Sequence, residues 1–291
     1  MQQVLKDKVG IITGANQGLG LEIARHYLAA GASLALCARN EALLNEAKTT
    51  LQALANPKQQ ILVAPCDVSS RADVDQFVEK TQDHFGRIDI LVNNAGVYGP
   101  KGEIEEVDWD DWVRAIDINL LGSILLCRAV LPSMKARGAG KIVQLSGGGA
   151  TNPLPRISAY AVSKAAIVRF IETLAEEVRD HHIDVNAIAP GALNTRMLDE
   201  IIEAGPDKVG KVFYERSLKQ KEAGGAPLDV GSRLAVFLGS DASNGITGKL
   251  ISAVWDKWEE WPNHLDELKK SDAYTLRRIT GRDRGFGWGD K

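Results

Sequence analysis

Tyr160 and Lys164 are the residues whose types and spacing could do acid–base chemistry together. They are four positions apart in a segment of helical periodicity, so they share one face of the predicted helix. A phenol has an ordinary pKa of about 10 and is a poor acid or base at neutral pH. A nearby ammonium favours the phenolate and lowers that pKa, so such a tyrosine can exchange a proton with a substrate hydroxyl. The alternative interpretation is an exposed tyrosine beside a solvated lysine.

A glycine-rich segment near the N-terminus is a candidate binding loop. It runs Thr13-Gly14-Ala15-Asn16-Gln17-Gly18-Leu19-Gly20 and lies between an apolar run and a helical pattern. Glycines there allow a tight turn, close approach to a pyrophosphate and packing of the helix against a sheet. The helix N-terminus adds free N–H groups and a positive dipole end. This context favours a dinucleotide site over an ordinary turn.

Arg39 follows the second apolar run, where the adenosine ribose of a dinucleotide is expected. An acidic residue there would favour NAD(H), but this chain has Ala38 and Arg39, and its next carboxylate is Glu41. A guanidinium matches a 2′-phosphate in shape and charge. The sequence therefore predicts NADP(H) in preference to NAD(H). The alternative is that Arg39 stacks on adenine or only faces solvent.

The elements that position these residues form an alternating pattern. Seven short apolar runs predict buried parallel strands: 9–13, 33–38, 61–66, 88–92, 141–145, 185–189 and 250–253. Helices are expected between them, at about 18–30, 41–55, 70–85, 108–137, 157–181 and 228–239, with Asn40 as a cap of the second and Ser69 or Ser70 as a cap of the third. This alternation is typical of an α/β fold with a doubly wound, parallel, seven-stranded sheet.

Four motifs occur in an order that resembles a known family. They are the glycine-rich segment, Asn93-Asn94-Ala95-Gly96, Tyr160-Ala161-Val162-Ser163-Lys164, and Pro190-Gly191 with Thr195 just after. Over about residues 5–251 the chain resembles the short-chain dehydrogenases/reductases of the single-domain, classical type. Neither the glycine spacing nor the C-terminal region resembles the related nucleotide-sugar epimerases and dehydratases.

The resemblance implies roles for further cofactor-binding residues. Asp67 and Val68 would contact the adenine ring, and Asn94, Ala95 and Gly96 would line the adenosine side. Pro190, Gly191 and Thr195 would hold the nicotinamide carboxamide. Tyr160 and Lys164 would also touch the cofactor, and Lys164 would bind the nicotinamide ribose. From the residues alone, the alternative for Asn93-Asn94-Ala95-Gly96 is a plain turn that ends a strand.

The resemblance also implies two more catalytic positions, and the chain departs from the family at one of them. Asn119 falls where the family keeps an asparagine that holds a helix bulge and a water linked to the lysine. The family hydroxyl after the fifth strand aligns with Gly147, one residue beyond Ser146. A bulge in the following glycines would restore Ser146, which we expect in this role. Thr151, Ser158 or a backbone amide are the alternatives.

Two segments stand outside the regular alternation. Residues 1–253 are expected to form one domain, in which 192–226 is too long for a simple connection and predicts a helical flap over the site. Residues 254–291 hold four of the six tryptophans of the chain, so this extension should pack on the domain or on a neighbouring subunit. Its arginines favour interface salt bridges over a substrate anion: Arg277, Arg278, Arg282 and Arg284.

Composition excludes several other classes. The net charge of −3 gives no support to nucleic-acid binding. The first eight residues lack an apolar run, and residues 115–131 are interrupted by polar side chains, so neither a secretory signal nor a membrane span is expected. Three scattered cysteines in apolar surroundings favour buried thiols over disulfides or a metal site. We expect a cytoplasmic homodimer or homotetramer without metal.

These inferences combine into one predicted function and one alternative. The prediction is an NADP(H)-dependent oxidoreductase that interconverts a small-molecule secondary alcohol and a ketone, with Tyr160 as the acid/base. The alternative is a dinucleotide-binding protein with little catalysis that acts in assembly or sensing, for which the displaced serine is the support.

Overall fold

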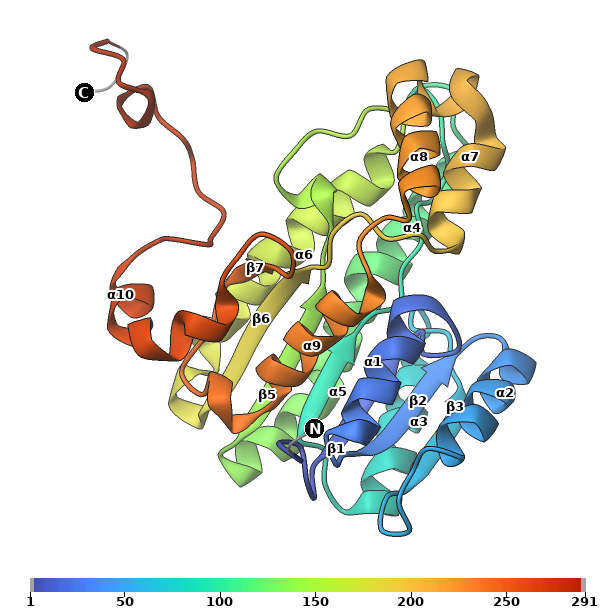
Figure 1. The fold of residues 1–291 in the computed structure, drawn as a ribbon, viewed down its shortest axis with the longest axis vertical. Coiled ribbons are helices and arrows are strands. Elements are labelled where there is room, and N and C mark those ends of the chain that lie inside the picture. The colour runs from blue at the N-terminus through green and yellow to red at the C-terminus, as the bar shows by residue number, and fades with distance from the viewer. Residues whose placement is uncertain (1–2, 289–291) are drawn as a thin grey trace.

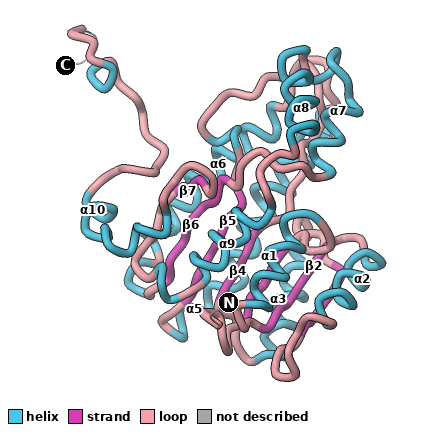
Figure 2. Tube along the Cα trace, viewed as in Figure 1, coloured by secondary structure: helices cyan, strands magenta, loops and turns pink. Residues whose placement is uncertain are grey.

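A seven-stranded parallel sheet forms the centre of the molecule, described here for residues 3–288 of a computed structural model. The strands lie in the order β3-β2-β1-β4-β5-β6-β7 (Figures 1 and 2). Their bounds are β1 Val9–Thr13, β2 Ser33–Ala38, β3 Ile61–Pro65, β4 Ile90–Asn93, β5 Gly140–Leu145, β6 Ile183–Ala189 and β7 Leu250–Ser252. The doubly wound α/β prediction is therefore confirmed, with strand ends within about two residues of those expected.

Helices cover both faces of this sheet, which explains why its strands are almost wholly apolar. One face carries α1 (Gly18–Ala29), α2 (Glu41–Gln52) and α9 (Leu228–Gly239). The other carries α3 (Arg71–Phe85), α5 (Gly122–Arg137) and α6 (Ser158–Glu177). The expected caps are present: the Asn40 side chain accepts from the Leu43 N–H, and the Ser70 side chain accepts from the Asp73 N–H.

The predicted helix 108–137 is continuous but not uniform. α4 (Trp109–Ile116) passes into a π-helical turn, Asp117–Leu121, before α5 begins. By length and composition alone the stretch Trp109–Arg137 could cross a bilayer. A core helix of a soluble protein has the same composition, and here Leu126, Val130 and Met134 are fully buried against the sheet.

Residues 192–226 are largely helical, as expected. α7 (Arg196–Val209) and α8 (Lys211–Ala223) form a pair beyond the carboxyl ends of the strands (Figure 1). Their apolar side chains Ile201, Val209 and Phe213 share a cluster with Tyr98 and Tyr160. The pair therefore lies over the end of the sheet where the predicted catalytic residues stand.

The C-terminal extension wraps around the β7 edge of the sheet. Trp258 and Trp261 are buried against the α9 side, where Trp258 lies 5.2 Å from the Phe237 ring. After α10 (Leu265–Lys270) the chain passes to the α6 side. There the Tyr274 carbonyl accepts from the Leu250 N–H at 2.8 Å.

Polar groups hold this extension against β7. Lys249 Nζ donates to the carbonyls of Ser271 and Ala273, and the Asp256 carboxylate accepts from the Ser252 N–H at 2.7 Å. We call residues 255–276 the strap. The strap covers a sheet edge rather than the predicted catalytic residues, while residues 277–288 extend away from the body of the molecule (Figure 1).

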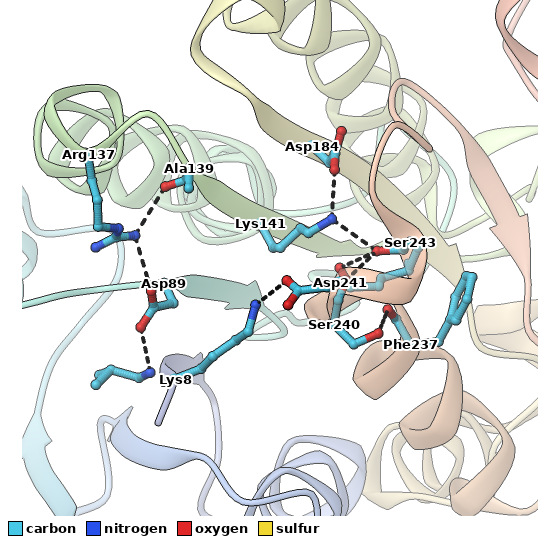
Figure 3. A network of polar contacts seen from close by, with 12 residues as sticks. Lys8, Asp89, Arg137, Ala139, Lys141, Asp184, Phe237, Ser240, Asp241 and Ser243 are labelled. Atoms are coloured by element: carbon cyan, nitrogen blue, oxygen red, sulfur yellow. Dashed lines mark hydrogen bonds and ion pairs between the residues drawn. The ribbon is translucent and has the colours of Figure 1, made fainter. Parts of the chain in front are cut away.

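A network of charged side chains closes the opposite, amino-terminal end of the sheet (Figure 3). Lys141 at the start of β5 pairs with Asp184 on β6 at 2.6 Å, and Asp89 before β4 accepts from the Val9 N–H. Arg137 Nη2 lies 3.4 Å from the Asp89 carboxylate. This end is filled by structural ion pairs, so the carboxyl ends of the strands are the place for a ligand.

Candidate active site

The strand order reverses between β1 and β4, and the predicted cofactor residues gather at that point. β1 leads outward to β2 and β3, whereas β4 leads the other way to β5, β6 and β7. Such a switch point leaves a crevice beyond the carboxyl ends of the two central strands. The glycine-rich segment follows β1, and Asn94, Ala95 and Gly96 follow β4.

The glycine-rich segment has the conformation that its residues predict. Gly14 has a φ of 62°, in the region that favours glycine. At Gly20 a Cβ would lie 2.5 Å from the Gly14 carbonyl oxygen, so only glycine allows the helix to pack this closely. Asn16, Gln17 and Gly18 lead into α1, whose N-cap Gln17 makes no side-chain cap. The first N–H groups of α1 are thus left to a ligand.

Thr13, at the end of β1, holds the loop after β4 in place beside the crevice. This role was not predicted from the sequence. Its hydroxyl accepts from the N–H groups of Asn94 and Ala95, both at 3.0 Å. The Asn94 amide in turn donates to the carbonyls of Thr13 and Gly14. The Asn94 side chain therefore ties β4 to the loop after β1.

The loop after β6 forms the facing wall. The Thr195 methyl group would be 3.7 Å from a Cβ at Gly18. A Cβ at Gly231 of α9 would lie 3.3 Å from Pro190 and 3.4 Å from Leu19, so these two buried residues pack around the same glycine. Gly191 has a φ of 96° and packs against Val254, at the start of the extension.

The residues predicted to surround the adenosine lie at the ends of β2 and β3. Arg39 is exposed, and it has no ion pair or hydrogen bond with any residue from 3 to 288. The Asp67 carboxylate accepts from the Ser69 N–H and hydroxyl and lies 3.6 Å from Arg114. Val68 is buried against Gly122. Arg39 is therefore an exposed cation at the end of β2 whose charge has no partner among residues 3–288.

Tyr160 and Lys164 project from the first turns of α6 toward the end of β5. Lys164 is 4% exposed, and its Nζ donates to the Leu145 carbonyl at 2.9 Å and lies 5.6 Å from the centre of the Tyr160 ring. Burial lowers the pKa of Lys164 to about 8. Burial also raises the pKa of Tyr160, with a smaller contribution from Tyr98. In the protein alone, burial therefore favours the neutral phenol over the phenolate.

Asn119 is fully buried in the π-helical turn and has its side chain fully engaged. Its Oδ1 accepts from the Val97 N–H, and its Nδ2 donates to the Val97 carbonyl and the Ser163 hydroxyl. The neighbouring backbone joins it to the lysine, because a Cβ at Gly96 would lie 3.3 Å from Asn119 Oδ1 and 3.7 Å from Lys164 Nζ. Sequence reasoning placed Asn119 here but not its partner Ser163.

The backbone of Gly147 lies next to the Tyr160 phenol. A Cβ at Gly147 would lie 2.2 Å from the Tyr160 hydroxyl oxygen. Ser146 is buried, and its hydroxyl has no hydrogen-bond partner in the described part of the chain. Of the alternatives, Ser158 accepts from Trp112 Nε1 at 3.0 Å, and Thr151 is exposed. The role predicted for Ser146 stays a prediction.

Tyr98 is a further site residue without a sequence signal. It lies in the loop after β4, and its ring centre is 4.8 Å from that of Tyr160. Burial raises the pKa of Tyr98, and the nearby Glu200 carboxylate raises it further. Tyr98 is thus a neutral phenol whose ring packs against the ring of Tyr160.

Neither a metal cluster nor a disulfide is found in residues 3–288. No group of three His, Cys, Asp or Glu side chains in that range could hold a metal ion. Cys37, Cys66 and Cys127 are buried free thiols.

Comparison with known proteins places the chain among nucleotide-dependent oxidoreductases. Residues 8–205 match the model of the short chain dehydrogenase family. The 7alpha-hydroxysteroid dehydrogenase of Escherichia coli strain K12 is 32% identical over 85% of this chain and 93% of its own. The crystal structure of levodione reductase superposes with a TM-score of 0.78 at 28% identity, covering 89% of this chain and 99% of the other.

Two further similar structures differ in their bound cofactor. An NAD⁺-bound xylitol dehydrogenase has a TM-score of 0.76 at 26% identity and covers 85% of this chain and 98% of its own. A gluconate 5-dehydrogenase from Burkholderia cenocepacia, in complex with NADP and tartrate, has a TM-score of 0.75 at 26% identity, covering 86% and 95%. These relatives thus share the fold and the class of cofactor but not the choice between NAD and NADP.

Proposed function

The chain belongs to the short-chain dehydrogenase/reductase family, and on that premise we propose that it interconverts a secondary alcohol and a ketone with NADP(H), using Tyr160 as the acid/base. Membership makes it an oxidoreductase that acts on CH–OH groups. The observation that carries the mechanism is the pair formed by half-buried Tyr160 and buried Lys164 beside the crevice between β1 and β4.

The residues of the crevice fit a dinucleotide. The uncapped start of α1 offers N–H groups and a positive dipole end to a pyrophosphate. Asn94 and Thr13 hold the loops around it, and Pro190 and Thr195 form the facing wall. A bound nicotinamide would supply the hydride that is given to or taken from the substrate carbon.

The protein's own part in the reaction is the transfer of a proton. The raised pKa of Tyr160 keeps it a neutral phenol at pH 7, the form that can donate a proton to a ketone oxygen that becomes an alcohol. Lys164, with a pKa of about 8, is mostly an ammonium at that pH. Its charge would stabilise the phenolate that remains after the proton has left.

Arg39 supports the preference for NADP(H). It is exposed at the end of β2 and has no carboxylate partner among the described residues. A guanidinium with its donors available can bind a 2′-phosphate bidentately. NADPH, which carries this phosphate, should therefore bind more tightly than NADH.

The surroundings of Tyr160 favour a substrate with an apolar body. The Tyr98 ring packs on Tyr160, and both belong to an apolar cluster that includes Ile201 from α7 and Phe213 from α8. Apolar walls with a few polar groups are typical of sites for small organic ligands. We assign α7 and α8 the role of the flap over this substrate.

The decisive experiment compares the protein with its Tyr160→Phe variant in stopped-flow oxidation of NADPH by a panel of cyclic and aromatic ketones. The variant should bind NADPH unchanged, because it lacks only the hydroxyl, while turnover falls by about 10²–10⁴-fold. Tyr274→Phe is the matched control, because Tyr274 is 42% exposed and lies in the strap. Full activity of Tyr160→Phe would refute the mechanism.

The same assay separates the remaining options. NADH in place of NADPH should be the weaker reductant, since it offers no phosphate to Arg39. A protein that binds NADPH tightly but reduces none of the ketones would favour the non-catalytic alternative, a dinucleotide-binding protein acting in assembly or sensing. We further propose a cytoplasmic homo-oligomer, as is common among short-chain dehydrogenases/reductases.

A further inference from the structure

The backbone of Gly147 and the hydroxyl of Tyr160 occupy adjoining space with no room between them. A Cβ built on Gly147 would lie 2.2 Å from Tyr160 Oη and 3.2 Å from Cζ. No other glycine in residues 3–288 would bring a Cβ so close to a neighbouring atom. The phenol oxygen therefore fills the volume in which any side chain at position 147 would begin.

The backbone conformation of Gly147 does not itself require glycine. Its φ of −179° and ψ of 178° are extended values that any residue adopts. Space alone explains the glycine at this position. The next residue differs, because a Cβ at Gly148 would meet nothing within 4 Å.

The phenol has little freedom to retreat from an added side chain. The Tyr98 ring packs on it at 4.8 Å, and Ile157 and Ile201 belong to the same buried cluster. Lys164 stands 5.6 Å from the ring centre and is fixed by its bond to the Leu145 carbonyl. A side chain at position 147 would thus displace the hydroxyl within a packed cluster, and such overpacking is costly.

We propose that Gly147 is a positioning residue for the reaction, because its missing side chain lets the Tyr160 hydroxyl reach its working place against the end of β5. This inference rests on the proposed role of Tyr160. It reverses what the resemblance suggests, since the family usually has a hydroxyl at this position. In this chain, restoring that serine removes activity instead of adding a substrate contact.

The kinetic test compares Gly147→Ser and Gly147→Ala with Gly148→Ser and Gly148→Ala. Both changes at position 147 should lower kcat by about 10- to 100-fold, because shifts near 1 Å of a reacting group have effects of this size. The KM for NADPH should stay within about twofold, since the phenol and not the glycine-rich loop is displaced. The variants at position 148 should keep wild-type kcat.

A stability cycle tests the contact independently of activity. Gly147→Ala should lower Tm in the wild-type background, but most of that loss should disappear when Tyr160→Phe removes the oxygen that the new Cβ meets. Wild-type or higher kcat in Gly147→Ser would overturn the inference, as would equal losses of Tm in both backgrounds. An active Tyr160→Phe single variant would instead refute the proposed function and leave the stability cycle intact.

Discussion

At the scale of single residues, two buried lysines show how a partner decides the effect of a charge. Lys164 is 4% exposed and bonds only to a carbonyl, whereas Lys141 is 7% exposed and pairs with Asp184 at 2.6 Å (Figure 3). Burial lowers the pKa of both. The Lys164 ammonium, which has no carboxylate partner, therefore destabilises the folded state. Its proposed role in proton transfer explains why a lysine is present there.

Replacing Lys164 by Met should stabilise the protein while abolishing turnover. A pKa lowered from 10.5 to about 8 corresponds to about 3 kcal/mol of destabilisation as an upper limit. The folded state binds fewer protons than the unfolded state between these values, so this cost is full below pH 8 and fades as the pH rises toward 10.5. Thermal unfolding of both proteins at pH 7 and pH 9.5 should show the gain shrinking.

Lys141→Met is the control, for which we expect a loss of stability instead of a gain. It leaves the largely buried Asp184 carboxylate without its partner, so it should lower stability by about 3–5 kcal/mol. A loss of stability in Lys164→Met at pH 7 would contradict the assignment of Lys164 as a costly buried charge.

Residue types could be predicted at this site more readily than residue contacts. The spacing of Tyr160 and Lys164 and the glycines after β1 follow from helix and turn geometry, which is local. The contact of Gly147 with Tyr160 joins the end of β5 to α6 through packing. The support of Asn94 by Thr13 spans 81 positions, and no local pattern encodes either contact.

At the scale of elements, the strands were predictable because a parallel sheet covered on both sides leaves continuous apolar runs. The strap was predicted only as a segment that must pack, because a tryptophan-rich composition shows that a segment needs a partner surface but not which surface. Its place on β7 depends on particular pairs, such as Trp258 with Phe237 and Leu250 with Tyr274. The π-helical turn at Asn119 likewise arises from side-chain bonds that join three segments.

Trp258 and Trp255 provide a direct test of the strap. Trp258 is 5% exposed and Trp255 is 84% exposed. Trp258→Ala should lower the free energy of unfolding by about 3–5 kcal/mol, the usual cost of removing a buried aromatic side chain. Trp255→Ala should change it by no more than about 0.5 kcal/mol. Equal effects in chemical denaturation would show that the strap does not belong to the core.

At the scale of the whole molecule, residues 277–288 form a segment that projects from the folded body. They extend from the body (Figure 1), and Ile279, Phe286 and Trp288 are 57%, 54% and 76% exposed. Large apolar side chains grouped on a projecting segment mark an interaction site. Within the proposed homo-oligomer, we expect this segment to contact a second copy of the chain.

Truncation after Leu276 should therefore weaken assembly without unfolding the subunit. Leu276 stays anchored, because its N–H donates to Glu172 and its carbonyl accepts from Arg169. In sedimentation, the truncated protein should form a smaller species than the full chain. The Tm values of the two proteins, compared at concentrations where both are dissociated, should be similar. An unchanged sedimentation coefficient would assign the oligomer contact to another surface.

The strap also affects the tendency of the protein to aggregate through its sheet edges at high concentration or on heating. The outward N–H groups of Leu250 and Ser252 are already taken by Tyr274 and Asp256, and β3 at the far edge ends in Pro65, which has no N–H to give. A strand from another chain thus finds the donors of Leu250 and Ser252 occupied at β7 and one donor missing at the end of β3, and both features disfavour edge-to-edge growth. If the strap detaches from β7 on heating, the N–H groups of that edge strand become exposed. Aggregation should therefore begin at the β7 edge of the sheet.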